Sequence, residues 1–258
     1  MTPAANLTLL YGRLPLEDRF SAAREDGFSA VEIQFPYDRE PQWYVQQLSD
    51  NGLRLVLINT PKESDAAPWG RAALTSQRDK FRRDFERAAE FCDATDCPAV
   101  HVMAGLVAPE QAAAAHDTLL SNLEWAAQQH PGLTLLLEGL NSHDVPGYLY
   151  STPGAVRQVL SDVGAESVGM QFDFYHVLRE GLGVQAELEA SLPWIRHVQV
   201  AGNPERQEPD LARDAGVLAG FQRLSEAGYR GCVGYEYRPA GRVRDGLRWA
   251  DALFPYFS

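Results

Sequence analysis

The second half of the chain repeats one pattern, in which an apolar run of strand length ends in a polar residue. Glu138 follows LTLLL, Asp173 follows SVGMQF, Gln199 lies within IRHVQV and Glu236 follows CVGY. Successive members are 35, 26 and 37 residues apart, about the length of one strand, one helix and two loops. If each run is a parallel strand of one closed sheet, all four side chains lie at the same rim. The pattern therefore predicts a single site built from these four residues.

Strand-like and helix-like segments alternate along the whole chain, with eight of each. The chain has 258 residues, 45% of them hydrophobic, which suits one (β/α)₈ (TIM) barrel of about 250 residues. A doubly wound open sheet has the same alternation, but the count of eight and the shared rim favour the closed barrel. We predict one α/β domain over residues 1–258, with a long loop at 60–75. The predicted strands are 6–11, 30–35, 53–59, 99–104, 133–138, 167–173, 196–201 and 231–237, and the predicted helices are 16–26, 41–51, 77–95, 109–129, 153–161, 184–192, 216–227 and 242–253.

Charge and cysteine content limit the classes of partner and compartment. The formal net charge is −12, from 23 Lys and Arg against 35 Asp and Glu, so the chain lacks the basic surface that nucleic-acid binding needs. Its three cysteines form no CxxC pair, so neither a disulfide framework nor a thiolate zinc site is indicated. No run reaches the ~18 apolar residues of a membrane span, and the N-terminus has no basic start. We expect a cytoplasmic protein that binds neither nucleic acid nor membranes.

The four polar residues offer oxygen ligands only. Three carboxylates and one amide oxygen suit Mg²⁺ or Mn²⁺ better than zinc, which is bound mainly by Cys and His. Any one of these acids could instead form an ordinary ion pair with Arg or Lys. Four consecutive strand ends carrying such residues favour a metal site, in which the ion would act as Lewis acid and template.

Several segments resemble the hydroxypyruvate isomerase family, a branch of the xylose-isomerase-like TIM barrels. The resemblance is most specific over residues 138–239, in LLLEGLNSHDVPGY, QFDFYH, HVQVAGNPER and GYEYRP, and extends to NLTLLYG and VEIQFPYD near the start. It implies that the metal ligands follow strands five to eight and are Glu138, Asp173, Gln199 and Glu236. It also implies that Glu138 and Glu236 form the proton-transfer pair.

The reaction implied by this resemblance converts hydroxypyruvate to tartronate semialdehyde through an enediolate. The family also places His176 and His197 near the substrate, and an arginine at the position of Arg206 would bind the substrate carboxylate. For each of these three residues an ordinary structural contact is an open alternative. Glu32 could orient a ligand or a histidine, whereas Asn6, His101 and Trp69 receive no role.

Two loops depart from the family pattern, at 60–75 and 202–214, so the reaction class is better supported than the substrate. A related acid such as a 2-oxotetronate is an alternative substrate. A ketose 3-epimerase would usually carry a histidine in place of Gln199, and an endonuclease of the related branch would need a histidine-rich zinc cluster and a basic face. A sugar-acid-binding barrel without activity is the non-enzyme alternative. The sequence leaves open the native metal, the pathway and whether the chain forms a homo-oligomer.

Overall fold

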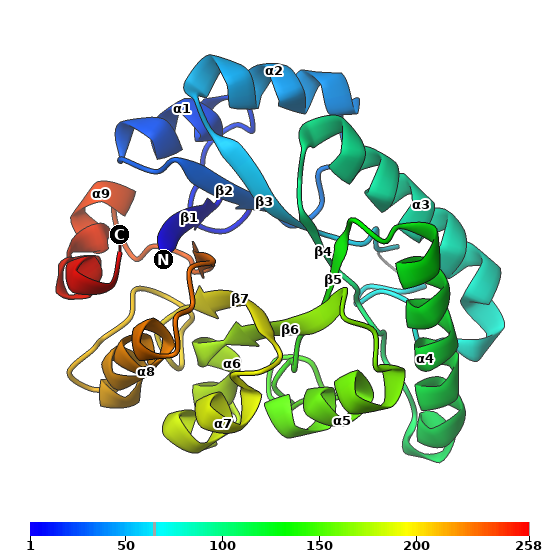
Figure 1. Cartoon of the computed structure of the whole chain (residues 1–258). Coiled ribbons are helices and arrows are strands. Elements are labelled where there is room, and N and C mark those ends of the chain that lie inside the picture. The colour runs from blue at the N-terminus through cyan, green and yellow to red at the C-terminus, as the bar shows by residue number, and fades with distance from the viewer. Residues whose placement is uncertain (64–65, 258) are drawn as a thin grey trace.

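The chain folds into a closed barrel of eight parallel strands. The computed structural model describes residues 1–63 and 66–257, and the strands follow each other around the barrel in chain order, with β8 pairing back to β1 (Figure 1). The fold predicted from the sequence, a (β/α)₈ barrel, is confirmed. The strands are β1 (Thr2–Asn6), β2 (Ala30–Ile33), β3 (Arg54–Asn59), β4 (Ala99–His101), β5 (Thr134–Leu137), β6 (Val168–Asp173), β7 (Ile195–Val200) and β8 (Cys232–Tyr235).

Helices surround the barrel, and local sequence signals fix several of their ends (Figure 1). Pro41 opens one helix and Gly52, with a φ of 60°, closes it in the left-handed conformation. The Thr152 hydroxyl caps another by accepting from the Ala155 amide at 3.2 Å. The helices are α1 (Asp18–Glu25), α2 (Pro41–Asn51), α3 (Arg78–Thr95), α4 (Ala112–Gln129), α5 (Pro153–Val163), α6 (Phe174–Arg179), α7 (Val184–Ser191), α8 (Ala215–Glu226) and α9 (Val243–Gly246), with 3₁₀ segments η1 (Thr75–Gln77), η2 (Pro109–Gln111) and η3 (Leu247–Tyr256).

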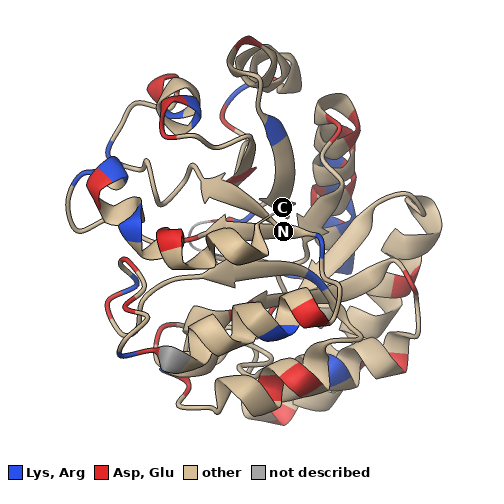
Figure 2. Cartoon of the chain, turned by 60° about the vertical axis from the view of Figure 1, so that its left-hand side comes forward, with Lys and Arg blue, Asp and Glu red and all other residues tan. Residues whose placement is uncertain are grey.

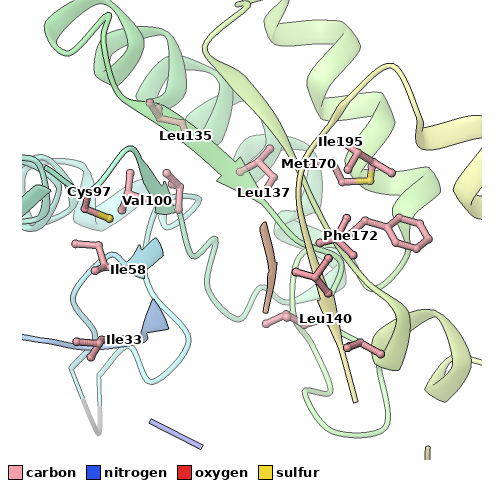
Figure 3. Packing of buried hydrophobic residues seen from close by; sticks show 14 of the residues in the cluster. Ile33, Ile58, Cys97, Val100, Leu135, Leu137, Leu140, Met170, Phe172 and Ile195 are labelled. Atoms are coloured by element: carbon pink, nitrogen blue, oxygen red, sulfur yellow. The ribbon is translucent and has the colours of Figure 1, made fainter. Parts of the chain in front are cut away.

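The two faces of the strands bury different side chains. Residues one apart point to opposite faces, and the outward face packs branched and aromatic side chains under the helices. Figure 3 shows part of this packing, in which Leu137 of β5 lies beside Met170 of β6, its partner in register. Burial of these apolar side chains is the main driving force for assembling the helices on the barrel.

The inward face carries small apolar residues at the amino end of the barrel and polar residues above them. The lower layer includes Ala4, Ala30, Ala99 and Leu136, which form a separate buried cluster. Two residues further along the same strands stand Asn6, Glu32, His101 and Glu138, all at most 4% exposed. The barrel interior therefore changes from apolar to polar toward the carboxyl ends of the strands.

Two predicted elements at the ends of the chain are wrong. The first strand is Thr2–Asn6 and not 6–11, because Asn6 ends it: the Asn6 carbonyl accepts from the Leu10 amide at 2.9 Å and its side chain accepts from the Leu9 amide at 3.1 Å. Leu7, Leu10 and Tyr11, which follow Asn6 in this turn, are buried. The single helix predicted at 242–253 is a short α9 followed by the 3₁₀ segment η3, which contains Pro255.

Other predicted elements differ mainly at their boundaries. The short helix α6, between β6 and α7, was not predicted. The expected long loop at 60–75 carries an isolated bridge between Glu63 and Ala67 and another between Gly70 and Ala104. Ser64 and Asp65, which belong to that loop, lie outside the described residues.

Charged residues of both signs are spread over the outer helices, and the two described ends of the chain lie side by side. Figure 2 shows acidic and basic positions interspersed along the outer helices. The two ends of the chain lie close together, and the Met1 amino group donates to the Tyr256 carbonyl at 3.2 Å (Figure 1). No helix in the described part of the chain is long and apolar enough to cross a membrane.

Candidate active site

The four predicted ligands all stand at the carboxyl ends of β5 to β8. Asp173 is the last residue of β6 and is paired in register with Gln199 on β7, while Glu138 and Glu236 directly follow β5 and β8. Each of the four is at most 4% exposed. The spacing in the sequence thus corresponds to four neighbouring strand ends at one rim of the barrel.

Glu138, Asp173 and His176 offer oxygen and nitrogen atoms that lie within 4.8 Å of one another. Glu138 Oε1 and Asp173 Oδ2 are buried and accept no hydrogen bond from any described residue. A buried carboxylate oxygen without a partner is costly, and a divalent cation satisfies it directly. These residues therefore fit a hard cation of the Mg²⁺ or Mn²⁺ type.

The ring of His176 is oriented by the loop after β5. The Asn141 backbone amide donates to Nδ1 at 3.0 Å, so the neutral ring carries its proton on Nε2. That nitrogen lies 3.6 Å from Glu138 Oε1 and 3.7 Å from Asp173 Oδ2. Burial, followed by the positive charge of Arg206, lowers the pKa of His176 well below its usual value. His176 thus presents a neutral N–H to the site, which suits a hydrogen-bond donor better than a metal ligand.

The carboxyl groups at the rim outnumber the positive groups beside them, among which Arg206 opposes the rise in their pKa values. Burial raises the pKa of Glu138 well above its usual range, and the charges of Glu236 and Asp173 raise it further. Burial also raises the pKa of Asp173 to about 7, against the opposing effect of Arg206. The pKa of Glu236 is raised by burial as well, again opposed by Arg206. A bound divalent cation would favour the ionised form of all three.

Arg206 reaches into the same site from the loop after β7. Its Nη2 donates to Glu236 Oε2 and lies 3.7 Å from Asp173 Oδ2. Its guanidinium carbon lies 4.9 Å from the centre of the Tyr175 ring, and the side chain is 18% exposed. Arg206 therefore forms a largely buried ion pair with Glu236 at the rim.

His197 lies deeper in the barrel than the sequence led us to expect of a substrate-binding residue. It stands two residues before Gln199 on β7, and its Nε2 is hydrogen-bonded to Glu32 Oε1. Because β2 and β7 are not neighbours, this contact crosses the barrel interior. His197 therefore supports the floor of the site through Glu32.

Four polar residues that received no part in the predicted site line its floor and walls. Gln171 Nε2 donates to Glu138 Oε2 at 2.8 Å and to Gln199 Oε1 at 2.6 Å. Gln34 Nε2 donates to Glu236 Oε1 at 2.6 Å. The other two are Asn6, which donates to Glu32 and Glu236, and His101, whose Nδ1 lies 3.5 Å from Glu138 Oε2.

The signal that could have found three of these residues is the two-residue period of the strands. Gln171 stands two positions before Asp173, Gln34 stands two after Glu32, and His101 stands two after the inward-facing Ala99. Burial, and secondarily the charge of His197, lowers the pKa of His101 to about 3, so this ring is neutral.

Comparisons with known proteins agree with the barrel and with the resemblance read from the sequence. A "2-oxo-tetronate isomerase" of Cupriavidus necator is 37% identical over 257 residues, covering 98% of this chain and 97% of that protein. A human protein named "Putative hydroxypyruvate isomerase" is 35% identical over 257 residues, covering 95% and 92%. A crystal structure described as AP endonuclease, family 2, from Brucella melitensis has a TM-score of 0.88 and 31% identity, with both chains fully covered.

A family model matches residues 20–253, which is most of the chain. The barrel fold agrees with this family, and relatives more than 30% identical over nearly their full length support the same family. The chain belongs to the xylose isomerase-like TIM barrel family.

Proposed function

We propose that the protein is a metal-dependent isomerase of short 2-oxo-3-hydroxy acids, which interconverts hydroxypyruvate and tartronate semialdehyde or the corresponding pair of four-carbon acids. The observation that carries this proposal is the pair of buried glutamates, Glu138 and Glu236, at one rim of the barrel. Beside them lie carboxylate oxygens that accept no hydrogen bond from the described residues. The relatives named as isomerases support the reaction class.

Glu138, Asp173, Gln199 and Glu236 are the residues proposed to hold Mg²⁺ or Mn²⁺. When bound, the ion would supply a Lewis acid that stabilises negative charge developing on the two adjacent substrate oxygens. The oxygen-rich donor set matches the preference of both ions.

The proton transfer in this proposal needs one base and one acid on opposite sides of the substrate. One glutamate removes the proton from C3, the C3 electrons form a C2–C3 double bond, and the carbonyl oxygen on C2 becomes an enediolate oxygen. The other glutamate protonates C2, and the C3 hydroxyl passes its proton to the C2 oxygen as C3 becomes the new carbonyl, so substrate and product have the same atoms. The two glutamates then regain their starting protonation states by exchange with solvent. A positioned carboxyl group typically contributes 10²–10⁴-fold to such a step.

Arg206 and His176 are proposed to bind the rest of the substrate. A guanidinium pairs with a carboxylate in two parallel hydrogen bonds, and Arg206 is already in the site above Tyr175. His176 presents its Nε2 proton beside Glu138 and Asp173, where it can donate to a substrate hydroxyl or carbonyl oxygen. Both contacts are the same for the three-carbon and the four-carbon acid, because both acids share carbons one to three.

The second candidate substrate is the four-carbon acid, 2-oxotetronate. Two relatives named 2-oxo-tetronate isomerase support it. The test is product formation by NMR with hydroxypyruvate and with 2-oxotetronate, each in Mn²⁺ and in EDTA. We expect conversion of at least one acid that requires Mn²⁺, and the larger kcat/KM identifies the substrate. Conversion of neither acid, or equal rates in EDTA, would contradict the proposed function.

A further inference from the structure

A buried carboxylate, Glu32, lies beneath the proposed metal site and touches no described Lys or Arg side chain. It is 1% exposed. Oε2 accepts from Asn6 Nδ2 at 3.1 Å and from Gln199 Nε2 at 2.9 Å, and Oε1 is hydrogen-bonded to His197 Nε2. A carboxylate in this position is expensive to bury, and an apolar residue would cost less. Its contacts therefore point to a role beyond packing.

Strand β8, which is separated from β2 by β1, leaves room for this carboxylate. Gly234 on β8 is paired in register with Gln199, and a Cβ atom at that position would overlap the carboxyl group of Glu32. Its φ lies outside the left-handed region, so backbone conformation does not require a glycine there. The carboxyl group of Glu32 thus occupies the space that a side chain at position 234 would fill.

The hydrogen bond to Glu32 determines which end of the Gln199 amide points toward the rim. An amide has a donor end and an acceptor end, and an ionised carboxylate can only accept. Glu32 therefore holds the NH₂ group of Gln199, and Oε1 points the other way, to Gln171 Nε2, which also donates to Glu138. Only the oxygen end of an amide can bind a hard cation.

We propose that Glu32 is a positioning residue, which fixes the amide of Gln199 so that its oxygen faces the cation, and that Gly234 provides the space for it. This inference rests on the proposed function, in which Gln199 is a metal ligand. Replacing Glu32 by glutamine keeps the shape of the side chain but adds an NH₂ group, so the amide of Gln199 loses its fixed orientation.

The experiment is calorimetric titration of the apoprotein with Mn²⁺, together with thermal melting. Loss of a residue that orients a metal ligand typically costs 10–100-fold in metal affinity. We expect a Kd for Mn²⁺ raised by about that factor in Glu32→Gln and in Gly234→Ala. The matched control is Glu124→Gln, which removes an exposed glutamate of α4 and should leave the Kd unchanged.

A double variant separates orientation from folding. In Glu32→Gln with Gln199→Glu the total charge is that of the wild type, and the amide introduced at position 32 can donate to the carboxylate introduced at position 199. Because a carboxylate at position 199 presents oxygen in either orientation, we expect the Mn²⁺ affinity of this double variant to stay within a few-fold of wild type. Loss of affinity in Glu32→Gln but not in the double variant would show that amide orientation is what Glu32 supplies.

Two results would overturn the inference and are distinguishable from each other. If the wild type binds Mn²⁺ and both Glu32→Gln and Gly234→Ala bind it equally well, only the role of Glu32 is wrong, whatever the change in melting temperature. If the wild type itself binds no divalent ion, the proposed metal-dependent function fails and the inference fails with it.

Discussion

At the scale of single residues, the rim carries buried acidic groups whose charge is only partly compensated by Arg206. Asp173 shows this most clearly, since one of its oxygens caps α6 through the Tyr175 amide at 2.9 Å, whereas the other accepts no hydrogen bond from a described residue and has Arg206 Nη2 only at 3.7 Å. The cap fixes the carboxyl group in place, and the free oxygen faces the rim. The same residue thus starts a helix and presents an oxygen that is proposed to bind the cation.

Asp173 should make the metal-free protein less stable as the pH rises. Its pKa is about 7 when folded, chiefly because of burial, against 3.8 as the usual value. Between these values the unfolded state loses its proton before the folded state does, so the free energy of unfolding falls from about pH 4 to pH 7 and then levels off. In EDTA we expect the melting temperature to fall between pH 5 and pH 8, and Mn²⁺ to reduce that fall.

The control for this pH effect is Asp173→Asn, because asparagine also caps a helix but does not titrate. Its melting temperature in EDTA should change less than that of the wild type over the same range. An equal change in both proteins would show that Asp173 does not carry the effect.

At the scale of elements, three segments that are distant in sequence meet around Tyr175. The hydroxyl of Tyr175, on α6, donates to Asp144 Oδ2 at 2.6 Å and lies 3.3 Å from the Pro204 carbonyl oxygen. Its ring lies under Arg206, so α6 connects the loop after β5 to the loop after β7. The loop that departs from the family pattern is thereby held against the site.

Tyr175→Phe tests this connection, because the ring stays and the hydrogen bond to Asp144 and the contact with the Pro204 carbonyl are lost. A net hydrogen bond contributes about 0.5–1.5 kcal/mol, so we expect KM for the 2-oxo acid to rise by about 3–10-fold while kcat changes less. Steady-state kinetics measures both, with Tyr256→Phe at the C-terminal end as the matched control. An unchanged KM would contradict a role for this contact in placing Arg206.

At the scale of the whole molecule, the chain closes the barrel with β8, and its last described segment, η3, then packs against the hydrophobic core. Leu253 in η3 is fully buried against the core, whereas the adjacent Phe254 is 67% exposed. The C-terminal segment thus contributes one apolar anchor, although it is not the regular helix expected from the sequence.

Removing that anchor should destabilise the fold. Leu253→Ala should cost about 2–5 kcal/mol in the free energy of unfolding, as buried leucines do. Phe254→Ala should stay within about 0.5 kcal/mol, as exposed substitutions do. Urea unfolding of both variants measures the difference, and equal effects would show that η3 does not anchor the end of the chain.

The barrel and the four strand-end residues could be predicted because eight apolar runs and their polar ends are local patterns. The first strand was misplaced because its residues, TPAAN, are small and less apolar than the following NLTLLY; the barrel interior needs small side chains such as Ala4 there. Gln171 stands only two residues before Asp173 on the same face of β6, whereas Asn6 received no role and Glu32 was not linked to Gln199, because these contacts join strands that are far apart in the sequence. Only the closed barrel brings them together.

The central claim is that Glu138 and Glu236 transfer a proton on a metal-dependent isomerase. The most direct measurement is NMR of the accepted 2-oxo acid in D₂O with Mn²⁺, comparing wild type, Glu138→Gln and Glu236→Gln with an enzyme-free blank. We predict Mn²⁺-dependent replacement of the C3 hydrogen by deuterium, with product formation reduced by about 10²–10⁴-fold in each variant. Wild-type rates of product formation in either variant, or exchange in the wild type that persists in EDTA, would contradict the claim.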